Sequence, residues 1–308
     1  MNKKTRALVL LSGGLDSILA AKLLMEQGIE IEGICFYSNF FNCGLARKAA
    51  KQLGINLREI DIKEEFLKFL KQKPKYGYGV GLNPCIDCHV LMLKKAGEIM
   101  RTGGFSFIAT GEVLNERPMS QHKQALKIVE KEAGLEGYLL RPLSAKLLEL
   151  TQMEINGLVA RDKLMDISGR SRQKQFELAK KFGISDFPTP AGGCVLTQEG
   201  FVSRLKELMG HKPDFNSYDV ELIKIGRHFW TDGAQIILGR NEEENGRFAG
   251  MAAKNDIIVE PENFVGPTAL IRGENDSDDI VGKAKGLIAK FLPKAKRIEI
   301  FQFKTKKL

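Results

Sequence analysis

The feature that most constrains this chain is an apolar run followed by a loop with two glycines and a helical pattern. Residues 7–11 are apolar, the loop reads Ser12-Gly13-Gly14-Leu15-Asp16-Ser17, and helical spacing continues to Gln27. Two glycines let the backbone approach an anion, and the N–H groups that open a helix point toward it. We therefore expect a phosphate cradle at the end of a strand, where α/β sheets bind ligands. A tight turn that needs glycine only for its conformation is the alternative.

Strand and helix patterns alternate after this loop. Strand patterns at 31–37 and 56–62 flank a helical pattern at 44–53, and a buried strand is expected at 105–110. This order predicts an α/β fold, with a parallel Rossmann-like sheet and helices on both of its faces. Further helical patterns lie at 64–73, 89–101, 147–164 and 173–182.

The chain length of 308 residues predicts more than one domain. Gly, Pro, Asp and Asn cluster between His211 and Tyr218, which predicts domains at 1–212 and 217–308. The second domain is expected to be a smaller α/β unit, and its basic tail at 304–307 reads as a frayed, solvated end. Its expected strands are 221–229, 234–238, 256–259 and 297–303, and its expected helices are 242–254 and 279–291.

Composition limits the partners and the location. The chain has 47 Lys and Arg against 38 Asp and Glu, and the net charge of +9 favours a polyanionic partner larger than a nucleotide. The apolar run at 7–11 is too short for a signal peptide or a membrane span, so we expect a cytoplasmic protein without membrane association. Five cysteines in a reducing compartment are not expected to form a disulfide framework. Cys35 reads as a core residue, and Cys43 has no assignment.

Three cysteines form the second chemical signal. Cys85-Ile-Asp-Cys88 precedes a helical pattern, so both thiols would lie in its first turn, where the helix dipole favours the thiolate. Cys194 follows a loop rich in proline and glycine. Three thiolates would leave one iron of a [4Fe-4S] cluster open to an external ligand. A persulfide relay, a zinc site completed by His89 and inert thiols are the alternatives.

Several short motifs occur in the order seen in the catalytic domain of tRNA thiouridine synthases. The two-glycine loop has no lysine and is therefore not a Walker loop; it resembles the pyrophosphate loop of ATP pyrophosphatases. The resemblance runs from Lys4 to Leu208, is greatest to the 4-thiouridine synthase branch and extends more distantly to the 2-thiouridylases. Unlike 4-thiouridine synthases, the chain starts at the catalytic strand without a THUMP region. The other motifs are Asn83-Pro84-Cys85-Ile-Asp-Cys88, Ala109-Thr110-Gly111-Glu112, Met119-Ser120-Gln121, Arg141-Pro142-Leu143 and Ala191-Gly192-Gly193-Cys194.

The resemblance implies a tRNA sulfurtransferase that converts ATP to AMP and pyrophosphate. A uridine carbonyl oxygen would be adenylated and then replaced by sulfur, giving 4-thiouridine, with 2-thiouridine as the alternative product. A ligase of the same fold that adenylates a carboxylate and a non-catalytic RNA-binding factor are the alternatives from other classes. The implied partners are tRNA and a sulfur donor, either sulfide or a cysteine desulfurase, and two chains could pair as a homodimer.

The same resemblance assigns residues to the nucleotide. The loop would hold the β- and γ-phosphates, and Asp16, expected to face solvent, would position Mg²⁺. The backbone near Phe36 would bind adenine, and Thr110 and Gly111 would lie near the α-phosphate. The residues expected to bind ATP are Ser12, Gly13, Gly14, Asp16, Ser17, Phe36, Thr110 and Gly111.

The resemblance also assigns the sulfur chemistry. Cys85, Cys88 and Cys194 would hold a [4Fe-4S] cluster that binds hydrosulfide at its open iron, or one of them would carry a persulfide. These three cysteines are the expected metal ligands, and together with Asp16 they are the expected catalytic residues. Glu112 is as consistent with a helix cap as with catalysis.

The end of the chain resembles a different family. Residues 225–229 and 239–245 are similar to the RNA-binding domain of NFACT proteins. We therefore expect this unit to bind RNA in place of a THUMP region. Arg227 and Arg240 are the expected phosphate contacts. The alternative is that both arginines cap turns in a domain that serves only dimerisation.

Aromatic and basic clusters have two interpretations each. Phe229-Trp230 could stack on a base, although core packing is the more ordinary interpretation. The basic clusters could contact tRNA backbone or form solvated helix faces. These clusters are Lys68, Lys71, Lys73 and Lys75 beside Tyr76 and Tyr78, and Arg161, Lys163, Arg170, Arg172 and Lys174.

Overall fold

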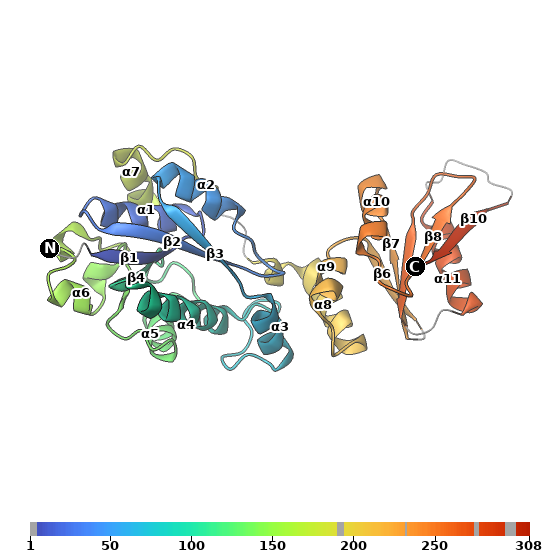
Figure 1. Ribbon diagram of the computed structural model, residues 1–308, viewed down its shortest axis with the longest axis horizontal. Helices are drawn as coiled ribbons and strands as arrows, with labels where there is room; N and C mark the ends of the chain where they lie inside the picture. Colours follow the sequence, from blue (N-terminus) through green and yellow to red (C-terminus); the bar gives the residue numbers. More distant parts are fainter. Residues whose placement is uncertain (1–4, 190–193, 232, 274–276, 293–299) are drawn as a thin grey trace. The chain divides into compact units, whose positions relative to one another are not determined.

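The chain forms two compact units, each with its own five-stranded sheet (Figure 1). The computed structural model describes residues 5–189, 194–231, 233–273, 277–292 and 300–308. The units comprise Met1–Gln198 and Glu199–Leu308. A parallel sheet with helices in the first unit and an antiparallel sheet with helices in the second confirm the predicted α/β class.

The first sheet is parallel, with the strand order β3-β2-β1-β4-β5. Because β1 pairs with β2 on one side and β4 on the other, successive crossovers leave β1 in opposite directions. The carboxyl ends of β1 and β4 therefore border a switch point, where open α/β sheets bind ligands. The strands are β1 (Arg6–Leu10), β2 (Glu30–Tyr37), β3 (Asn56–Asp61), β4 (Phe107–Thr110) and β5 (Leu139–Leu140).

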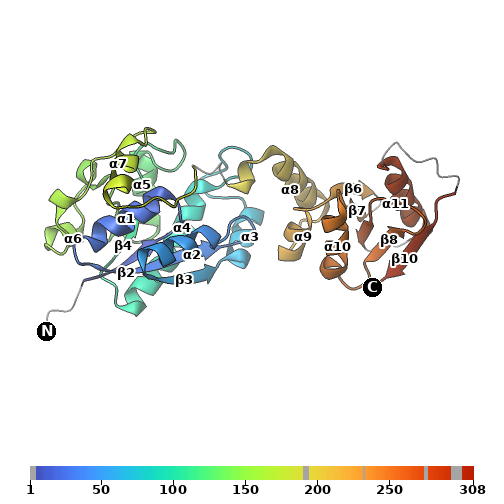
Figure 2. The same cartoon turned by 90° about the horizontal axis from the view of Figure 1, so that it is seen from above.

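Helices cover both faces of this sheet (Figures 1 and 2). On one face, Ala7 and Val9 of β1 join a buried cluster with Ala21 and Leu24 of α1, and α2 and α7 lie on the same side. Helices α4 and α5 pack together on the other face. The helices are α1 (Leu15–Met25), α2 (Gly44–Leu53), α3 (Lys63–Lys71), α4 (Cys85–Gly103), α5 (Lys123–Glu132), α6 (Gln152–Ile155) and α7 (Gln173–Lys181).

The prediction of a long helix at 147–164 is wrong. Only α6 and the short turns η1 (Ala145–Leu147) and η2 (Arg161–Lys163) occur there. Thr151 interrupts the pattern because its hydroxyl and backbone N–H both bond to Glu154, at 2.8 Å, and start a new helix. Arg161 then closes the segment on itself by donating to Glu154 at 2.6 Å and to the carbonyl of Leu148 at 3.0 Å.

The second sheet is antiparallel, with the strand order β10-β8-β9-β7-β6. Helix α11 covers one face and α10 the other, since their buried residues belong to two separate apolar clusters on the two sides of the strands. The elements after the turn η3 (Val195–Thr197) are α8 (Glu199–His211), α9 (Ser217–Leu222), β6 (Arg227–Thr231), β7 (Ala234–Leu238), α10 (Glu242–Met251), β8 (Ile257–Pro261), β9 (Ala269–Gly273), α11 (Asp278–Lys290) and β10 (Phe303–Lys307).

Several elements of this unit differ from expectation. Helix α8 groups with the second unit rather than preceding it, and Arg204 of α8 donates to the carbonyl of Ile223 at 2.7 Å. The strand expected at 221–229 starts later, because the Asn216 side chain caps α9 by accepting from Tyr218 N at 2.9 Å. The basic tail is not frayed: it forms β10, which pairs with β8. Residues 297–299 of the expected last strand lie outside the described residues.

A buried ion network ties α9 to the second sheet. Arg272 of β9 contacts Asp256 at 2.6 Å and Asp219 of α9 at 3.8 Å, and Lys212 contacts Asp219 at 3.0 Å. Both carboxylates are almost completely buried. Buried charges persist only when they are paired, so Arg272 compensates two groups that would otherwise be strongly unfavourable.

We expect Arg272→Leu to destabilise the second unit by about 3–5 kcal/mol, because it leaves two buried carboxylates undercompensated. Urea unfolding followed by the fluorescence of Trp230, the single tryptophan, measures this unit. Arg247→Leu, at an exposed position on α10, is the matched control and should change stability little. Equal transitions for the two variants would contradict the role given to Arg272.

Candidate active site

The two-glycine loop joins β1 to the start of α1 and has the form of a phosphate cradle. Gly14 caps α1, and its carbonyl accepts hydrogen bonds from Ser17 N at 3.1 Å and from the Ser17 hydroxyl at 2.8 Å. The Ser12 hydroxyl donates to that of Ser17 at 3.3 Å and accepts from Gly14 N at 3.3 Å. These bonds hold the loop so that the first N–H groups of α1 are presented together, as an anion requires.

Two glycines are required by close backbone approach. Gly13 has φ +80°, and a Cβ there would lie 2.3 Å from the carbonyl carbon of Leu45 in α2. A Cβ at Gly111 would lie 2.5 Å from the backbone nitrogen of Ser17. The chain leaving β4 therefore passes directly against the amino end of α1, which places Thr110 and Gly111 beside the phosphate loop.

Phe36 lies at the third strand end. It is the penultimate residue of β2, it is buried, and β2 pairs directly with β1. All the residues expected to bind ATP thus lie at the carboxyl ends of β1, β2 and β4 or in the first turn of α1. The sheet brings together positions from three distant parts of the sequence, and their roles toward ATP remain our proposal.

Asp16 does not face solvent as expected. Helix α7 lies beside α1, and Arg172 at its start donates to Asp16 Oδ2 at 3.2 Å. Burial raises the pKa of Asp16, and Arg172 opposes this change. Asp16 Oδ1 and both amide atoms of the fully buried Gln175 make no close hydrogen bond within the described part of the chain, although the Gln175 side chain lies near enough to lower the pKa of Asp16. An unpartnered carboxylate oxygen fits a magnesium ion, so Asp16 is a suitable ligand for one.

The three expected thiols lie near one another. Leu82 N donates to the carbonyl of Leu196 at 3.0 Å, which joins the chain before Cys85 to the chain after Cys194. Burial raises the pKa of Cys88, and negative charge on Cys194 and Cys85 raises it further. All three thiols are partly exposed. Residues 190–193, which contain the Ala-Gly-Gly of the last motif, lie outside the described residues.

Two sequence-based expectations for these thiols are not supported. The helix dipole was expected to favour thiolates, but burial raises the pKa of Cys85, Cys88 and Cys194. Within the residues that the structure describes, no group of three or more His, Cys, Asp or Glu side chains is arranged to hold a metal ion. His89, considered as a zinc ligand, instead directs Nδ1 toward Glu112 at 2.9 Å. This arrangement does not fit a cluster or a zinc ion, and we derive no step through either.

The other two cysteines are paired. Cys35, buried as expected, and Cys43 form a disulfide with a Cα–Cα distance of 5.9 Å. The bridge joins β2 to the residue that caps α2. A cysteine pair eight residues apart gave no sign of this in the sequence, where no disulfide framework was expected.

A buried carboxylate links the thiol helix to the nucleotide strand. Glu112, two residues after β4, accepts from Thr110 and from Arg141 Nε, both at 3.0 Å, and its other oxygen contacts His89 of α4. Burial alone would raise the pKa of Glu112, but Arg141 and His89 lower it to about 2. Arg141 is buried and also pairs with Glu130 at 3.0 Å. Arg141 is therefore a buried cation held between two carboxylates.

Sequence patterns missed several charged residues of the site. Arg117 is exposed, and its charge lowers the pKa of both Asp16 and Cys85, so it lies within electrostatic range of the phosphate loop and of the thiols. Glu116 lies near Asp16, whose negative charge adds to the effect of burial in raising the pKa of Glu116. Arg172 was identified only as part of a basic cluster. Glu116 and Arg117 precede Met119-Ser120-Gln121, and that motif was the one available signal.

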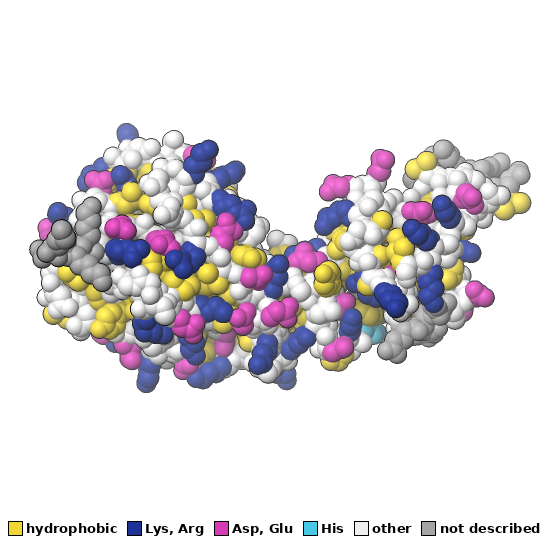
Figure 3. Space-filling model, viewed as in Figure 1, with side chains coloured by type: hydrophobic (Ala, Val, Ile, Leu, Met, Phe, Trp, Pro, Cys, Tyr) yellow, Lys and Arg dark blue, Asp and Glu magenta, His cyan; other side chains and the backbone are white. Residues whose placement is uncertain are grey.

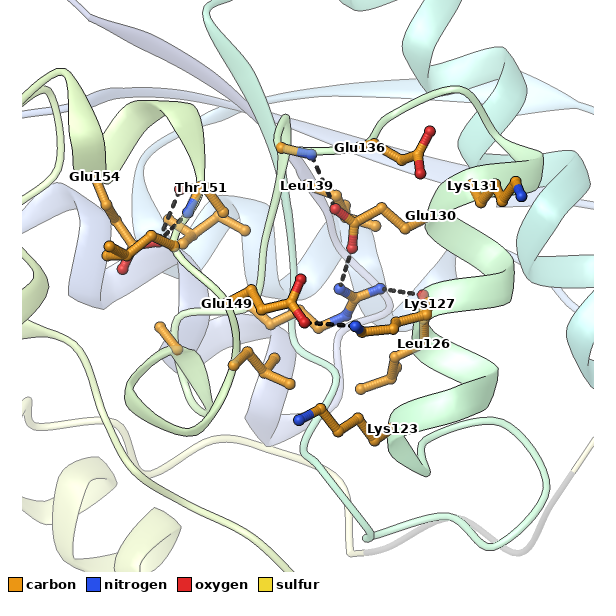
Figure 4. Close-up of a pocket in the computed structure, with 16 residues that line it drawn as sticks. Lys123, Leu126, Lys127, Glu130, Lys131, Glu136, Leu139, Glu149, Thr151 and Glu154 are labelled. Atoms are coloured by element: carbon orange, nitrogen blue, oxygen red, sulfur yellow. Dashed lines mark hydrogen bonds and ion pairs between the residues drawn. The ribbon is translucent and has the colours of Figure 1, made fainter.

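A pocket of about 300 Å³ lies elsewhere in the first unit, between α5 and the segment around α6 (Figure 4). Lys127 and Glu149 face one another across it at 2.5 Å, and Glu130 pairs with Arg141. None of the residues expected to bind ATP or sulfur lines it. Its charges largely compensate one another, so we assign the chemistry to the strand ends.

Comparison with known families agrees with this geometry. Residues 5–181, which contain the loop, Cys85, Cys88 and Glu112, match the family described as tRNA methyl transferase HUP domain. The chain belongs to this family. Residues 226–307 match the NFACT protein RNA binding domain, as the resemblance at 225–229 and 239–245 led us to expect.

Relatives of this HUP-domain protein include curated enzymes. The tRNA-specific 2-thiouridylase MnmA of Geotalea uraniireducens is 30% identical over 186 residues, which cover 52% of this chain and 48% of the relative. MnmA 1 of Syntrophus aciditrophicus is 27% identical over 232 residues, covering 66% and 56%. The chain thus spans about half the length of these relatives. A solved 4-thiouridine synthetase–RNA complex with bound ATP aligns with TM-score 0.36 and 19% identity, covering 58% of this chain and 52% of that one.

We expect Gly111→Ala to weaken ATP binding about tenfold or more, because the added Cβ displaces the first turn of α1. Isothermal titration with Mg·ATP measures the affinity. Gly210→Ala is the control, since a Cβ there meets nothing within 4 Å. Unchanged ATP affinity in Gly111→Ala would show that the contact with α1 does not shape the nucleotide site.

We expect Glu112→Gln to lower the stability of the first unit by about 3 kcal/mol at neutral pH. Because the pKa of Glu112 is depressed from 4.5 to about 2, its contribution is complete above 4.5 and disappears as the pH falls through 2. The difference in the free energy of unfolding between Glu112→Gln and the wild type should therefore become smaller as the pH falls from 4.5 to about 2. Urea unfolding followed by far-UV circular dichroism tests this, and Trp230 fluorescence reports the second unit as an internal control. A difference that is independent of pH would refute the assignment.

Proposed function

We propose that this protein catalyses ATP-dependent thiolation of a uridine in tRNA. The observation that carries the proposal is that the phosphate loop and the three thiols share one end of the first sheet. Gly111 joins β4 to the loop, Glu112 joins β4 to the helix of Cys85 and Cys88, and the charge of Arg117 reaches both sides. A ligase that adenylates a carboxylate would need the loop but not the thiols.

The first step would activate the uridine. Its carbonyl oxygen attacks the α-phosphorus of ATP, an O–P bond forms, and the bond to the β-phosphate breaks to release pyrophosphate. The N–H groups of the loop would hold the departing phosphates, and Arg117 is placed to offset their charge. Asp16 would hold Mg²⁺, which neutralises phosphate charge when bound. Arg172, the present partner of Asp16, would give up that contact.

The second step would deliver sulfur. We propose a persulfide relay, since the described thiols lie close together without the arrangement of a metal site. The terminal sulfur of a persulfide on one cysteine attacks the activated carbon, and the C–O bond breaks to release AMP. A neighbouring thiolate then attacks the cysteine sulfur, which forms a disulfide and leaves the thiocarbonyl on the base. Sulfide can open this disulfide directly, which forms a persulfide on one cysteine and releases the other as a thiolate. Alternatively, a thiol reductant restores both thiols and a cysteine desulfurase, as its own persulfide, transfers its outer sulfur to one of them.

The product we propose is 2-thiouridine. The curated relatives that match this chain are 2-thiouridylases, which supports this alternative better than the 4-thiouridine indicated by the sequence motifs. Nucleoside mass spectrometry with both standards distinguishes the two isomers by retention time.

We propose that the second unit binds the tRNA. Its match to an RNA binding domain supports this role. Lysine and arginine side chains are interspersed with acidic ones over its visible face (Figure 3). The two arginines chosen from sequence are already engaged: Arg227 lies over the ring of Phe291 at 4.9 Å, and Arg240 pairs with Glu244. A phosphate contact by either arginine would therefore compete with these existing interactions.

We expect Cys85→Ala, Cys88→Ala and Cys194→Ala each to lose nearly all thiolation while retaining ATP binding, because the three groups act as a unit. Thiolated tRNA is measured by its retardation in a mercury-containing gel, and ATP binding by isothermal titration. Iron analysis of the wild-type protein separates a persulfide relay from a cluster. Full thiolation by Cys194→Ala would refute both versions of the sulfur step.

A further inference from the structure

The second unit holds an aromatic stack outside its apolar core. His211, the last residue of α8, lies parallel to Trp230 of β6, with ring centroids 4.6 Å apart and an angle of 7° between the planes. His211 is exposed and Trp230 is partly exposed. Strand β6 is at the edge of the sheet. The stack therefore presents flat ring surface at an accessible border of the unit.

Phe229 and Trp230, which are neighbours on β6, point to opposite faces of the sheet. Phe229 packs against the apolar cluster under α11 and contacts the ring of Phe291, with centroids 5.9 Å apart. Trp230 points to the other face and belongs to neither apolar cluster identified among the described residues of this unit. The Phe-Trp pair thus divides into one core residue and one ring that packing of the core does not explain.

Charged groups of both signs lie around the stack. His228 shares the strand face of Trp230, and its pKa falls to about 4, first through burial and then through the charges of Arg204 and Arg240. Burial and the charge of Arg240 also lower the pKa of Arg204, whereas Glu207 and Glu244 raise it, and Arg240 is paired with Glu244. The accessible aromatic surface, and not an excess of positive charge, is therefore the feature of this face that fits nucleic acid.

We propose that the His211–Trp230 stack binds an unpaired base of RNA. This inference rests on the proposed RNA binding of the second unit and assigns the place where a base is held. Bases stack on aromatic side chains irrespective of sequence, because every base has a π face. Unpaired bases of this kind occur in the loops and ends of folded RNA.

The stack contains the only tryptophan, so its emission reports this site alone. The full chain is titrated with a fluorescein-labelled oligouridine of about 12 nucleotides for anisotropy, and with the unlabelled oligonucleotide for tryptophan emission. We expect both signals to saturate at the same concentration. Trp230→Leu keeps apolar bulk without the flat ring, and it should weaken binding about tenfold to a hundredfold.

Tyr218→Leu is the matched control, because Tyr218 is an exposed aromatic residue of the same unit at 77% exposure. It should bind as wild type does. Anisotropy that saturates while tryptophan emission stays constant overturns the stacking site and leaves RNA binding by the protein intact. Equal losses in Trp230→Leu and Tyr218→Leu overturn it as well. An oligonucleotide that does not bind at all overturns both the stacking site and the proposed RNA binding. Should Trp230→Leu lose its fold by circular dichroism, the wild-type emission titration decides alone.

Discussion

The buried carboxylate of Glu112 joins the part of the first unit that carries the thiols to the part that carries the phosphate loop. Arg141 holds one of its oxygens and His89 contacts the other, so β4 and α4 are fixed relative to one another at this point. Full burial makes this link sensitive to the loss of either partner. In the proposed reaction the uridine oxygen would be adenylated and sulfur would attack the carbon that bears it, and a fixed distance between the two half-sites would suit two steps on one carbonyl group.

The phosphate loop depends on two further contacts of the same unit. Gly111 allows the chain after β4 to pass against the first turn of α1, and Arg172 donates a hydrogen bond to the carboxylate of Asp16. The first contact is steric and fixed, whereas the second is an ion pair that a magnesium ion can replace. The buried side chain of Gln175 also lies near Asp16 and lowers the pKa of its carboxyl group. The loop thus combines a rigid backbone with an adaptable electrostatic environment.

Local patterns predicted the parts of the structure that depend on local physics. The strand, the glycine loop and α1 follow from spacing and backbone freedom, and the alternation that follows them predicts the parallel sheet. The sequence could not reveal contacts between distant elements, such as Arg141 with Glu112 or Arg172 with Asp16, because the two partners of each pair lie far apart along the chain. Helix propensity over 147–164 was outweighed by the cap at Thr151. Charge alone could not distinguish the strand β10 from a solvated tail, since its pairing with β8 is long-range.

The same reasoning explains the thiols. A helix dipole acts at any helix start and can be expected from the sequence, whereas burial depends on the whole fold and here raises the thiol pKa values.

The most direct test of the proposed thiolation is nucleoside mass spectrometry of tRNA incubated with the protein, Mg·ATP and sulfide. We expect a thiolated uridine that forms only when ATP is present and is accompanied by pyrophosphate. Release of pyrophosphate with a carboxylate substrate and without RNA, and no thiolated nucleoside, would contradict it.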